Sequence, residues 1–279
     1  MAMDCQTPAG VARPDYADAT VVRVRGGAAD AATQQDRVAE ETPVALEYNG
    51  ISHATMLATP GDLEDFALGF SLTEGIVGQP GDIRGIEIAP QFNGIVVQIE
   101  ISSACEARLK QRRRAMAGRT GCGLCGVETL GEVLRQLPPV AAGARPIPLA
   151  SVLRAMRALR AGQPLHDLTG ATHAAGWADA QGRVRLVRED VGRHNALDKL
   201  VGALARLGEP PGAGMALVSS RASFEMVQKC AAAGIGVLAA VSAPTALAIR
   251  VAQTTNVALL GFVRNADATL YTHPERIAS

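Results

Sequence analysis

The chain has 279 residues, of which 48% are hydrophobic and 19% charged, so it has ample apolar material for a large buried core and is not intrinsically disordered. Lysine plus arginine number 27, as do aspartate plus glutamate, and this balance provides no overall positive field for nucleic acid or an anionic membrane. Five irregularly spaced cysteines, the lack of a signal-peptide pattern and the lack of a long apolar run predict a soluble, reduced, cytoplasmic protein without nucleic-acid or membrane partners.

The N-terminal half is predicted to combine strands and helices. Residues 1–18 are expected to form a disordered tail, and residues 19–140 an α+β region. A strand is predicted from Val21. The alternating segment 42–59 predicts a hairpin that turns at Asn49–Gly50, a strong signal for a type I′ turn.

The next segment, 60–76, is predicted to be a helix that Asp62 caps and Gly75 ends. Two more strands are expected over 83–89 and 94–102, ahead of the basic stretch that precedes the first of two closely spaced cysteines.

After those cysteines, a helix is predicted over 127–137, because the pair Pro138–Pro139 would stop it there. Residues 141–148 are expected to be a linker. A helix over 149–162 then follows, with Ser151 as its expected cap.

Continuous apolar strands alternate with helices in the rest of the chain, which predicts a largely parallel sheet covered on both faces. The fold class is therefore α/β, with a layered domain over 141–279 and the smaller α+β region before it. The predicted elements are a hairpin over 172–190, helices over 193–208, 224–234 and 245–255, and strands over 215–220, 234–243 and 256–263.

The stretch RTGCGLCGVET places Cys122 and Cys125 two residues apart among three glycines. A zinc site would need two further ligands, of which Cys105 could be one, and His166 and His173 lack the spacing of a zinc finger. A redox disulfide calls for a fixed geometry at a helix N-terminus, which this glycine-rich loop does not favour. A plain glycine turn with inert thiols is a further alternative.

A sulfur-carrying thiol is the interpretation that the residues favour. Such a thiol must be exposed and partly ionised, and its loop must reach both a donor and an acceptor. The glycines provide reach, and the positive charges of Lys110–Arg119 favour a thiolate or persulfide. Cys122 is the predicted sulfur-bearing residue, with Cys125 either out of reach or assisting transfer. The sequence leaves open the roles of Cys105 and Cys230.

Anion-binding groups follow several predicted strands. Carboxyl ends of parallel strands and the helix N-termini beside them bind anions, so these groups are expected along one sheet edge. A single Ser or Thr there is more often a helix cap, and His173 and His194 could be satisfied structural histidines. The expected edge residues are Arg193, His194, Ser220, Arg221, Thr245, Arg264 and Asn265.

Several motifs together resemble the FdhD/NarQ family of sulfur carrier proteins required for formate dehydrogenase activity. They occur in order from about residue 42 to 272. The motifs are FALGFSLTEGI, GCGLCG, THAAGW, REDVGRHNALDKLVG, SSRASFEMVQKCAAAGI, SAPTALAI and GFVR followed by YT.

The resemblance implies a C-terminal three-layer α/β/α domain of the cytidine-deaminase type with a mixed sheet, which binds the cofactor. It implies sulfurtransferase activity: a cysteine desulfurase loads a persulfide on Cys122, with Cys125 nearby. The sulfur then passes to a bis(guanine dinucleotide) molybdenum or tungsten cofactor for formate dehydrogenase. It also implies a homodimer. Carried over onto this chain, the cofactor-binding segment is Phe262, Val263, Arg264, Asn265, Ala266 and Asp267.

Two qualifications accompany the resemblance. Many relatives have a glycine-rich or basic stretch where this chain reads NADATL, which weakens the assignment of residues 265–267 more than that of Arg264. Zinc-dependent deamination is not expected, because the position two after His173 is Ala175 and not glutamate. No resident metal is expected. An alternative function is an insertion chaperone that binds the cofactor without obligatory thiol chemistry.

Overall fold

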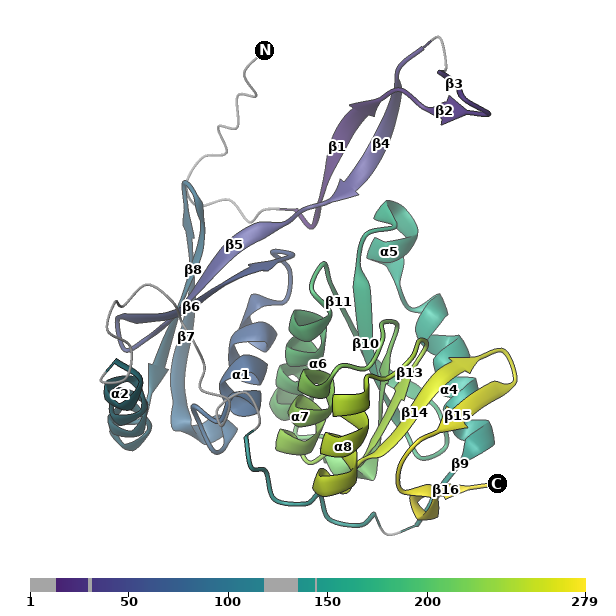
Figure 1. The fold of residues 1–279 in the computed structure, drawn as a ribbon. Helices are drawn as coiled ribbons and strands as arrows, with labels where there is room; N and C mark the ends of the chain where they lie inside the picture. The colour runs from purple at the N-terminus through teal and green to yellow at the C-terminus, as the bar shows by residue number, and fades with distance from the viewer. Residues whose placement is uncertain (1–13, 30–31, 118–134, 144) are drawn as a thin grey trace.

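The computed structural model describes most of the chain (Figure 1). Cys122 and Cys125, and most of the helix predicted over 127–137, lie outside the described residues, while residues 135–137 are not helical. None of the described helices is long and apolar enough to cross a lipid bilayer. The described ranges are 14–29, 32–117, 135–143 and 145–279.

A two-stranded arm projects from the body of the molecule (Figure 1). Strand β1 (Tyr16–Val21) pairs antiparallel with β4 (Gln34–Ala39), and two short strands, β2 (Val24–Arg25) and β3 (Ala28–Ala29), form the tip. Residues 16–18, expected in a disordered tail, belong to β1 because they pair with β4. The strand predicted from Val21 therefore begins earlier in the chain.

The N-terminal region contains a four-stranded sheet in the order β6-β5-β8-β7. Asn49 and Gly50 both have positive φ, 49° and 76°, as the predicted type I′ turn requires. Helix α1 packs its apolar face on the sheet, and α2 follows β8. The elements are β5 (Thr42–Tyr48), β6 (Ile51–Ala58), β7 (Ile83–Gln91), β8 (Gly94–Ile101), α1 (Leu63–Thr73) and α2 (Ser103–Ala117).

Both side-chain helix caps that were predicted, Asp62 and Ser151, are wrong. Asp62 precedes α1 but makes no capping bond, and its carboxylate lies 3.4 Å from Arg188 Nε instead. Ser151 lies inside α4 (Leu149–Ala161), whose N-cap is Pro148. The Asp62 carboxylate, which the sequence pattern predicted to cap α1, instead forms an ion pair with Arg188.

The C-terminal region is a three-layer α/β/α sandwich, as predicted. Its mixed sheet has the order β11-β10-β12-β13-β14-β15, in which β12, β13 and β14 are parallel. Alternate residues of β10 face opposite layers. Trp177 belongs to the core shared with α6 (Arg193–Leu207), α7 (Phe224–Ala232) and α8 (Ala246–Thr255), and Ala178 to the core shared with α4. The strands are β10 (His173–Asp179), β11 (Val184–Asp190), β12 (Gly214–Val218), β13 (Val237–Ala240), β14 (Ala258–Arg264) and β15 (Asp267–Leu270).

Helices and short elements complete this region. The helices are α4 (Leu149–Ala161), α5 (Pro164–Thr169), α6 (Arg193–Leu207), α7 (Phe224–Ala232) and α8 (Ala246–Thr255). The short elements are η1 (Pro80–Asp82), η2 (Pro211–Ala213), η3 (Pro274–Arg276), β9 (Ile147–Pro148) and β16 (Ile277–Ala278). Helix α5 and strand β15 were not predicted, because both are short and lack clear periodicity.

Helices α1 and α6 join the two regions through a close backbone contact. A Cβ atom on Gly69 would overlap the carbonyl of Asp198, and one on Gly202 would overlap the carbonyl of Asp65. The absence of side chains at these two glycines therefore allows the helices to touch. This contact places the end of α1 against the helical layer of the C-terminal region, where Thr73 Oγ1 donates to Asp198 Oδ1 at 2.6 Å.

Candidate functional site

The carboxyl ends of four strands lie at one edge of the C-terminal sheet. Strands β11 and β12 are both antiparallel to β10, so they run in the same direction as each other and as β13 and β14. The loops after these strands also touch: Ala222 pairs with Pro244, and the amide of Phe262 donates to the carbonyl of Ser242 at 3.3 Å. The predicted gathering of strand ends is thus confirmed.

Hydroxyl groups at this edge mainly hold the loops in place. Ser219 Oγ accepts from the amide of Ala174 at 2.9 Å, and Ser220 Oγ donates to the carbonyl of Arg221 at 2.9 Å. Thr245 caps α8 by accepting from the amide of Ala248 at 3.2 Å. The hydroxyls of Ser220 and Thr245 therefore have structural partners.

Three arginines supply positive charge along the same edge. Arg193 begins α6, and its Nε is buried without a hydrogen-bond partner among the described residues. Arg221 is exposed and forms no side-chain hydrogen bond or ion pair within the described part of the chain. Arg264 is exposed, with its guanidinium 5.9 Å from the ring centroid of Phe262. These groups could receive the phosphates of a ligand.

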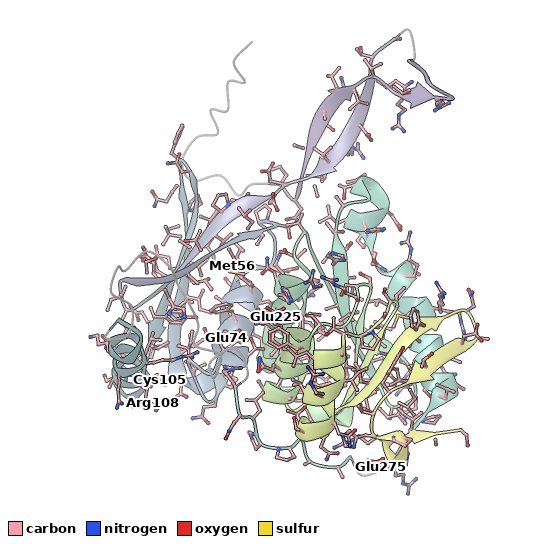
Figure 2. All side chains as sticks on the ribbon, viewed as in Figure 1. Met56, Glu74, Cys105, Arg108, Glu225 and Glu275 are labelled. Atoms are coloured by element: carbon pink, nitrogen blue, oxygen red, sulfur yellow. The ribbon has the colours of Figure 1, made fainter. Side chains whose placement is uncertain are left out.

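A hydrogen-bonded cluster links the start of α6 to the start of α7. His194 Nε2 lies 2.8 Å from Glu225 Oε2 and 3.3 Å from Ser223 Oγ, and that hydroxyl donates to the same carboxylate oxygen at 3.3 Å. The hydrogen bond from His194 is the main cause that lowers the pKa of Glu225. Figure 2 shows Glu225 near the centre of the molecule.

Sequence reasoning did not select Glu225 as a site residue. It stands two residues after Ser223 at the start of a helix, and an acidic residue there is usual for dipole reasons alone. Only the approach of His194 from another helix distinguishes it.

The segment Phe262–Asp267 forms the end of β14 and the turn into β15. Phe262 has φ 53° and is 37% exposed, whereas Val263 is fully buried. Asn265 has φ 56°, and its carbonyl accepts from Arg157 Nη1 at 3.1 Å. Arg264 and Asp267 are opposite each other in the antiparallel pairing of β14 with β15, and Ala266 is exposed.

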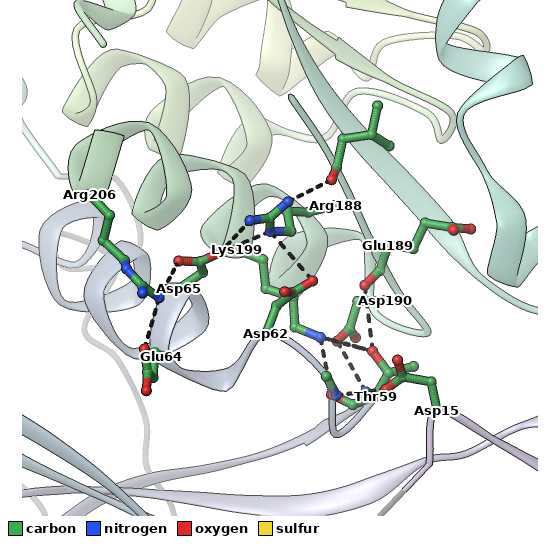
Figure 3. A network of polar contacts seen from close by, with 12 residues as sticks. Asp15, Thr59, Asp62, Glu64, Asp65, Arg188, Glu189, Asp190, Lys199 and Arg206 are labelled. Atoms are coloured by element: carbon green, nitrogen blue, oxygen red, sulfur yellow. Dashed lines mark hydrogen bonds and ion pairs between the residues drawn. The ribbon is translucent and has the colours of Figure 1, made fainter. Parts of the chain in front are cut away.

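Most of the motif REDVGRHN forms hydrogen bonds and an ion pair that connect the C-terminal region to the N-terminal region (Figure 3). Asp190 Oδ2 lies 2.7 Å from Lys199 Nζ and accepts from both the amide and the hydroxyl of Thr59, at 3.0 and 2.9 Å. Asn195 donates to the carbonyl of Leu57 at 2.8 Å. Of this motif, Arg193 and His194 remain at the edge.

A second polar network surrounds the start of helix α1 (Figure 3). Asp65 lies 2.6 Å from Arg188 Nη2 and 3.0 Å from Arg206 Nη1. Asp65 is 4% exposed, and these two arginines are the partners of its buried carboxylate.

Residues on both sides of the cysteine-bearing segment are attached to the end of α1. Arg112, on α2, donates to the carbonyl of Glu74 at 3.3 Å. Arg135 donates to the carbonyl of Thr73, and its Nη1 lies 3.9 Å from Glu74 Oε2. Residues 112 and 135 thus bind one helix end, although Cys122 and Cys125 themselves lie outside the described residues.

Buried charges lie beneath this attachment point. Lys229 Nζ is 2.9 Å from both Asp198 Oδ2 and Glu74 Oε1. Burial alone would raise the pKa of Glu74, but Lys229 and the neighbouring arginines lower it below its ordinary value. The Glu74 carboxylate therefore stays ionised.

The two described cysteines are buried. Cys230 is fully inaccessible in the core of the sandwich, and burial raises its pKa to about 12. Cys105 is 1% exposed, and Arg108 Nη2 lies 2.9 Å from its sulfur on α2 (Figure 2). Cys230 is thus a core residue.

Comparison with known proteins gives consistent matches over nearly the whole chain. The profile of the FdhD/NarQ family matches residues 39–278. A "Sulfur carrier protein FdhD" from Bordetella petrii is 81% identical over 265 residues, 95% of each chain, and one from Cupriavidus necator is 56% identical over 95% of this chain and 91% of the relative. A crystal structure of a provisionally assigned formate dehydrogenase accessory protein from Desulfotalea psychrophila superposes with a TM-score of 0.76 at 26% identity, covering 95% of this chain and 100% of that one.

Proposed function

Because the chain belongs to the FdhD/NarQ family, we propose that it is a sulfur carrier protein that serves formate dehydrogenase. In this proposal it is a cytoplasmic, homodimeric sulfurtransferase. A cysteine desulfurase loads it, and it delivers sulfur to the bis(guanine dinucleotide) molybdenum cofactor, which is its substrate. The observation that carries the proposal is the 81% identity to a relative named as a sulfur carrier, over 95% of both chains.

Loading is a thiolate exchange that needs no outside oxidant. The Cys122 thiolate attacks the outer sulfur of a persulfide on the donor. The new S–S bond forms at Cys122 while the donor S–S bond breaks, and its electron pair leaves with the donor cysteine as a thiolate. The reactive species is ionised, so nearby positive charge favours it.

In delivery, the outer sulfur passes to an acceptor group that supplies the electron pair of the new bond to sulfur, while the S–S bond breaks and its electron pair stays on Cys122, which returns to the thiolate form. The cofactor would lie along the carboxyl edge of the sheet, where Arg193, Arg221 and Arg264 can contact its phosphates and Phe262 offers an exposed ring. Their common edge supports this placement, because ligands of open α/β sheets bind outside the carboxyl ends of the strands.

Cys125 is a second thiol that could react with a persulfide on Cys122. If it attacked the inner sulfur of a loaded Cys122, the products would be a disulfide and free sulfide, and the cargo would be lost. We therefore propose that Cys125 assists the transfer of sulfur and does not resolve the persulfide.

The test is mass spectrometry of the protein after incubation with a cysteine desulfurase and cysteine. We expect an added mass of one sulfur atom on the peptide that contains Cys122, and no such adduct in Cys122→Ala. Cys230→Ala is the matched control, because that thiol is buried and should leave loading unchanged.

Activation of formate dehydrogenase separates the carrier from an insertion chaperone. A carrier requires Cys122, so the variant Cys122→Ala should leave the dehydrogenase inactive. Full activation by a chain that lacks both Cys122 and Cys125 would instead establish cofactor insertion without thiol chemistry.

A further inference from the structure

A histidine–carboxylate pair lies at the carboxyl edge of the sheet, where the first turns of α6 and α7 come together. His194 Nε2, on α6, is 2.8 Å from Glu225 Oε2, on α7. Both side chains remain accessible, at 27% and 43% exposed. A histidine in this setting can take up a proton from a reacting group.

The contacts of His194 fix which ring nitrogen carries the proton. The hydrogen bond from His194 lowers the pKa of Glu225, so this carboxyl is ionised at neutral pH and can only accept. Nε2 of the ring must therefore donate. In the neutral ring, Nδ1 is then the basic nitrogen, and no described residue binds it.

Ser223 does not turn this pair into a nucleophilic triad. Its hydroxyl lies 3.3 Å from Nε2 of His194, the nitrogen that also contacts Glu225, and it donates to Glu225 Oε2 at 3.3 Å. In a Ser–His–Asp triad, the hydroxyl and the carboxylate instead bind opposite nitrogens of the ring. The reactive group is therefore Nδ1 of His194, with a carboxylate on the other nitrogen to support it.

Neighbouring charges act on His194 from several elements. Arg193, next to it on α6, opposes a proton on the ring, whereas Asp190, at the end of β11, is paired with Lys199 at 2.7 Å. His173, at the start of β10, has its pKa lowered by burial first and then by Arg193, so it is uncharged at neutral pH. The carboxylate on α7 is thus the partner that favours a proton on His194.

Buried charges connect this pair to the end of α1. Asp198 follows His194 by four residues on α6, and Lys229 follows Glu225 by four residues on α7. Four residues rise about 6 Å along a helix. Lys229 Nζ lies 2.9 Å from both Asp198 Oδ2 and Glu74 Oε1, so the end of α1 is about one helical turn from the pair.

The length of the chain lets Cys122 reach the pair. Arg112 donates to the carbonyl of Glu74 at 3.3 Å, and Cys122 follows Arg112 by ten residues. An extended chain spans about 3.3 Å per residue, so ten residues reach about 33 Å. One turn of helix plus the side chains is well within that length.

We propose that His194 is the catalytic base that receives the proton of the outer sulfur during delivery, with Glu225 as its positioning residue. The acceptor, which is the cofactor of the proposed function, supplies the electron pair of the new bond to sulfur. The S–S bond breaks, its electron pair stays on Cys122, and the proton moves from the outer sulfur to His194 Nδ1. The Glu225 carboxylate stabilises the imidazolium that results. This role rests on the proposed function, which provides the sulfur and the acceptor.

The variant His194→Gln removes the base and keeps the hydrogen bond, because its amide nitrogen can take the place of Nε2 and donate to Glu225. The measurement is the rate at which the sulfur-loaded chain activates formate dehydrogenase, with the pH varied only during delivery. We expect this rate to fall about 100-fold or more, since general-base catalysis typically contributes about 10²–10⁴-fold. The wild-type rate should decrease from pH 8 to pH 5 as histidine gains a proton, and His194→Gln should lose this dependence.

Glu225→Gln tests the pair from its other side, and it serves alone if His194→Gln fails to fold. The amide oxygen still accepts from Nε2 but carries no charge that favours the protonated ring. We expect the pH midpoint of delivery to move below that of the wild type. A change that only loosened the packing of α6 against α7 would lower the rate without moving the midpoint.

His273→Asn is the matched control. His273 Nδ1 lies 3.0 Å from Glu275 Oε1, a pair of the same chemistry, and Figure 2 shows Glu275 well separated from Glu225. Asparagine keeps a nitrogen near the position of Nδ1. Both the rate of delivery and its pH midpoint should stay at the wild-type values in this variant.

Sulfur loading separates this proposal from the proposed function. His194→Gln should still acquire one sulfur atom on Cys122, because exchange with a donor persulfide uses the thiolate. Normal loading with an unchanged delivery rate in His194→Gln, or an unchanged midpoint in Glu225→Gln, would overturn the role of His194 alone. A wild-type chain that never acquires sulfur would overturn the carrier function together with it.

Discussion

Lys199 Nζ lies 2.7 Å from Asp190 Oδ2, and the two side chains are 1% and 0% exposed. They come from α6 and the end of β11, and both also bond to Thr59 in the N-terminal region. This buried pair therefore ties the edge of the sandwich to the first sheet.

Removing one member of this pair should be strongly destabilising. Lys199→Met leaves Asp190 as a buried, uncompensated charge, which typically costs about 3–5 kcal/mol. The free energy of unfolding, measured by urea denaturation, should fall by that amount.

The exposed pair of Lys110 with Glu106 provides the control. Its atoms are only 2.5 Å apart, but the lysine is 47% exposed, and pairs of this kind contribute about 0–1 kcal/mol. Equal losses of stability in Lys199→Met and Lys110→Met would contradict the structural role of the buried pair.

The contact of α1 with α6 predicts that a helix-favouring substitution will destabilise the protein. Gly69→Ala should gain about 1 kcal/mol from helix propensity alone. Its Cβ would overlap the Asp198 carbonyl, so we expect a net loss of roughly 1–3 kcal/mol or more in urea denaturation.

Gly81→Ala is the matched control, because no atom lies within 4 Å of a Cβ at that position. Its effect should stay within about 0.5 kcal/mol. A stabilised Gly69→Ala protein would show that the two helices are not packed this closely.

Glu74 should give a pH-dependent contribution to stability. The pKa of this carboxyl is lower in the folded chain than its ordinary value of 4.5. A depressed carboxyl pKa stabilises the folded state above the unfolded pKa, and the effect is lost as the pH falls through the folded value. Glu74→Gln should therefore be less stable than the wild type at pH 7, and the difference should shrink below about pH 4.5.

Urea denaturation of both proteins between pH 7 and pH 3 measures this difference. The matched variant Glu87→Gln removes an exposed carboxylate from β7, and it should show no comparable trend. A gap between Glu74→Gln and the wild type that stayed constant with pH would refute the electrostatic role of Glu74.

Cys230 should resist alkylation in the folded protein. Only the thiolate reacts, and burial both raises the pKa of Cys230 to about 12 and blocks access. After iodoacetamide treatment at pH 8, peptide mass spectrometry should find Cys230 unmodified in native protein and modified in urea. Rapid labelling of native protein would show that this helix opens.

Much of the fold could be predicted because its signals are local. The type I′ turn at Asn49–Gly50, the hairpin of β10 with β11 and the three helices after parallel strands depend on residues close in sequence. The gathering of strand ends at one edge followed from strand direction. Short elements such as α5 gave too little periodicity to detect.

The sequence by itself determined the order of elements, the layered architecture, the family resemblance and Cys122 as the candidate sulfur carrier. Only the tertiary structure decided how the polar residues are used: Asp190 and Lys199 bind Thr59, 131 and 140 residues away, Asp62 meets Arg188, and Glu225 meets His194. Backbone propensity acts over a few residues, whereas these partners meet only when separate elements pack. Whether a charged side chain serves a helix end, a buried ion pair or a ligand therefore depends on neighbours that local pattern does not specify.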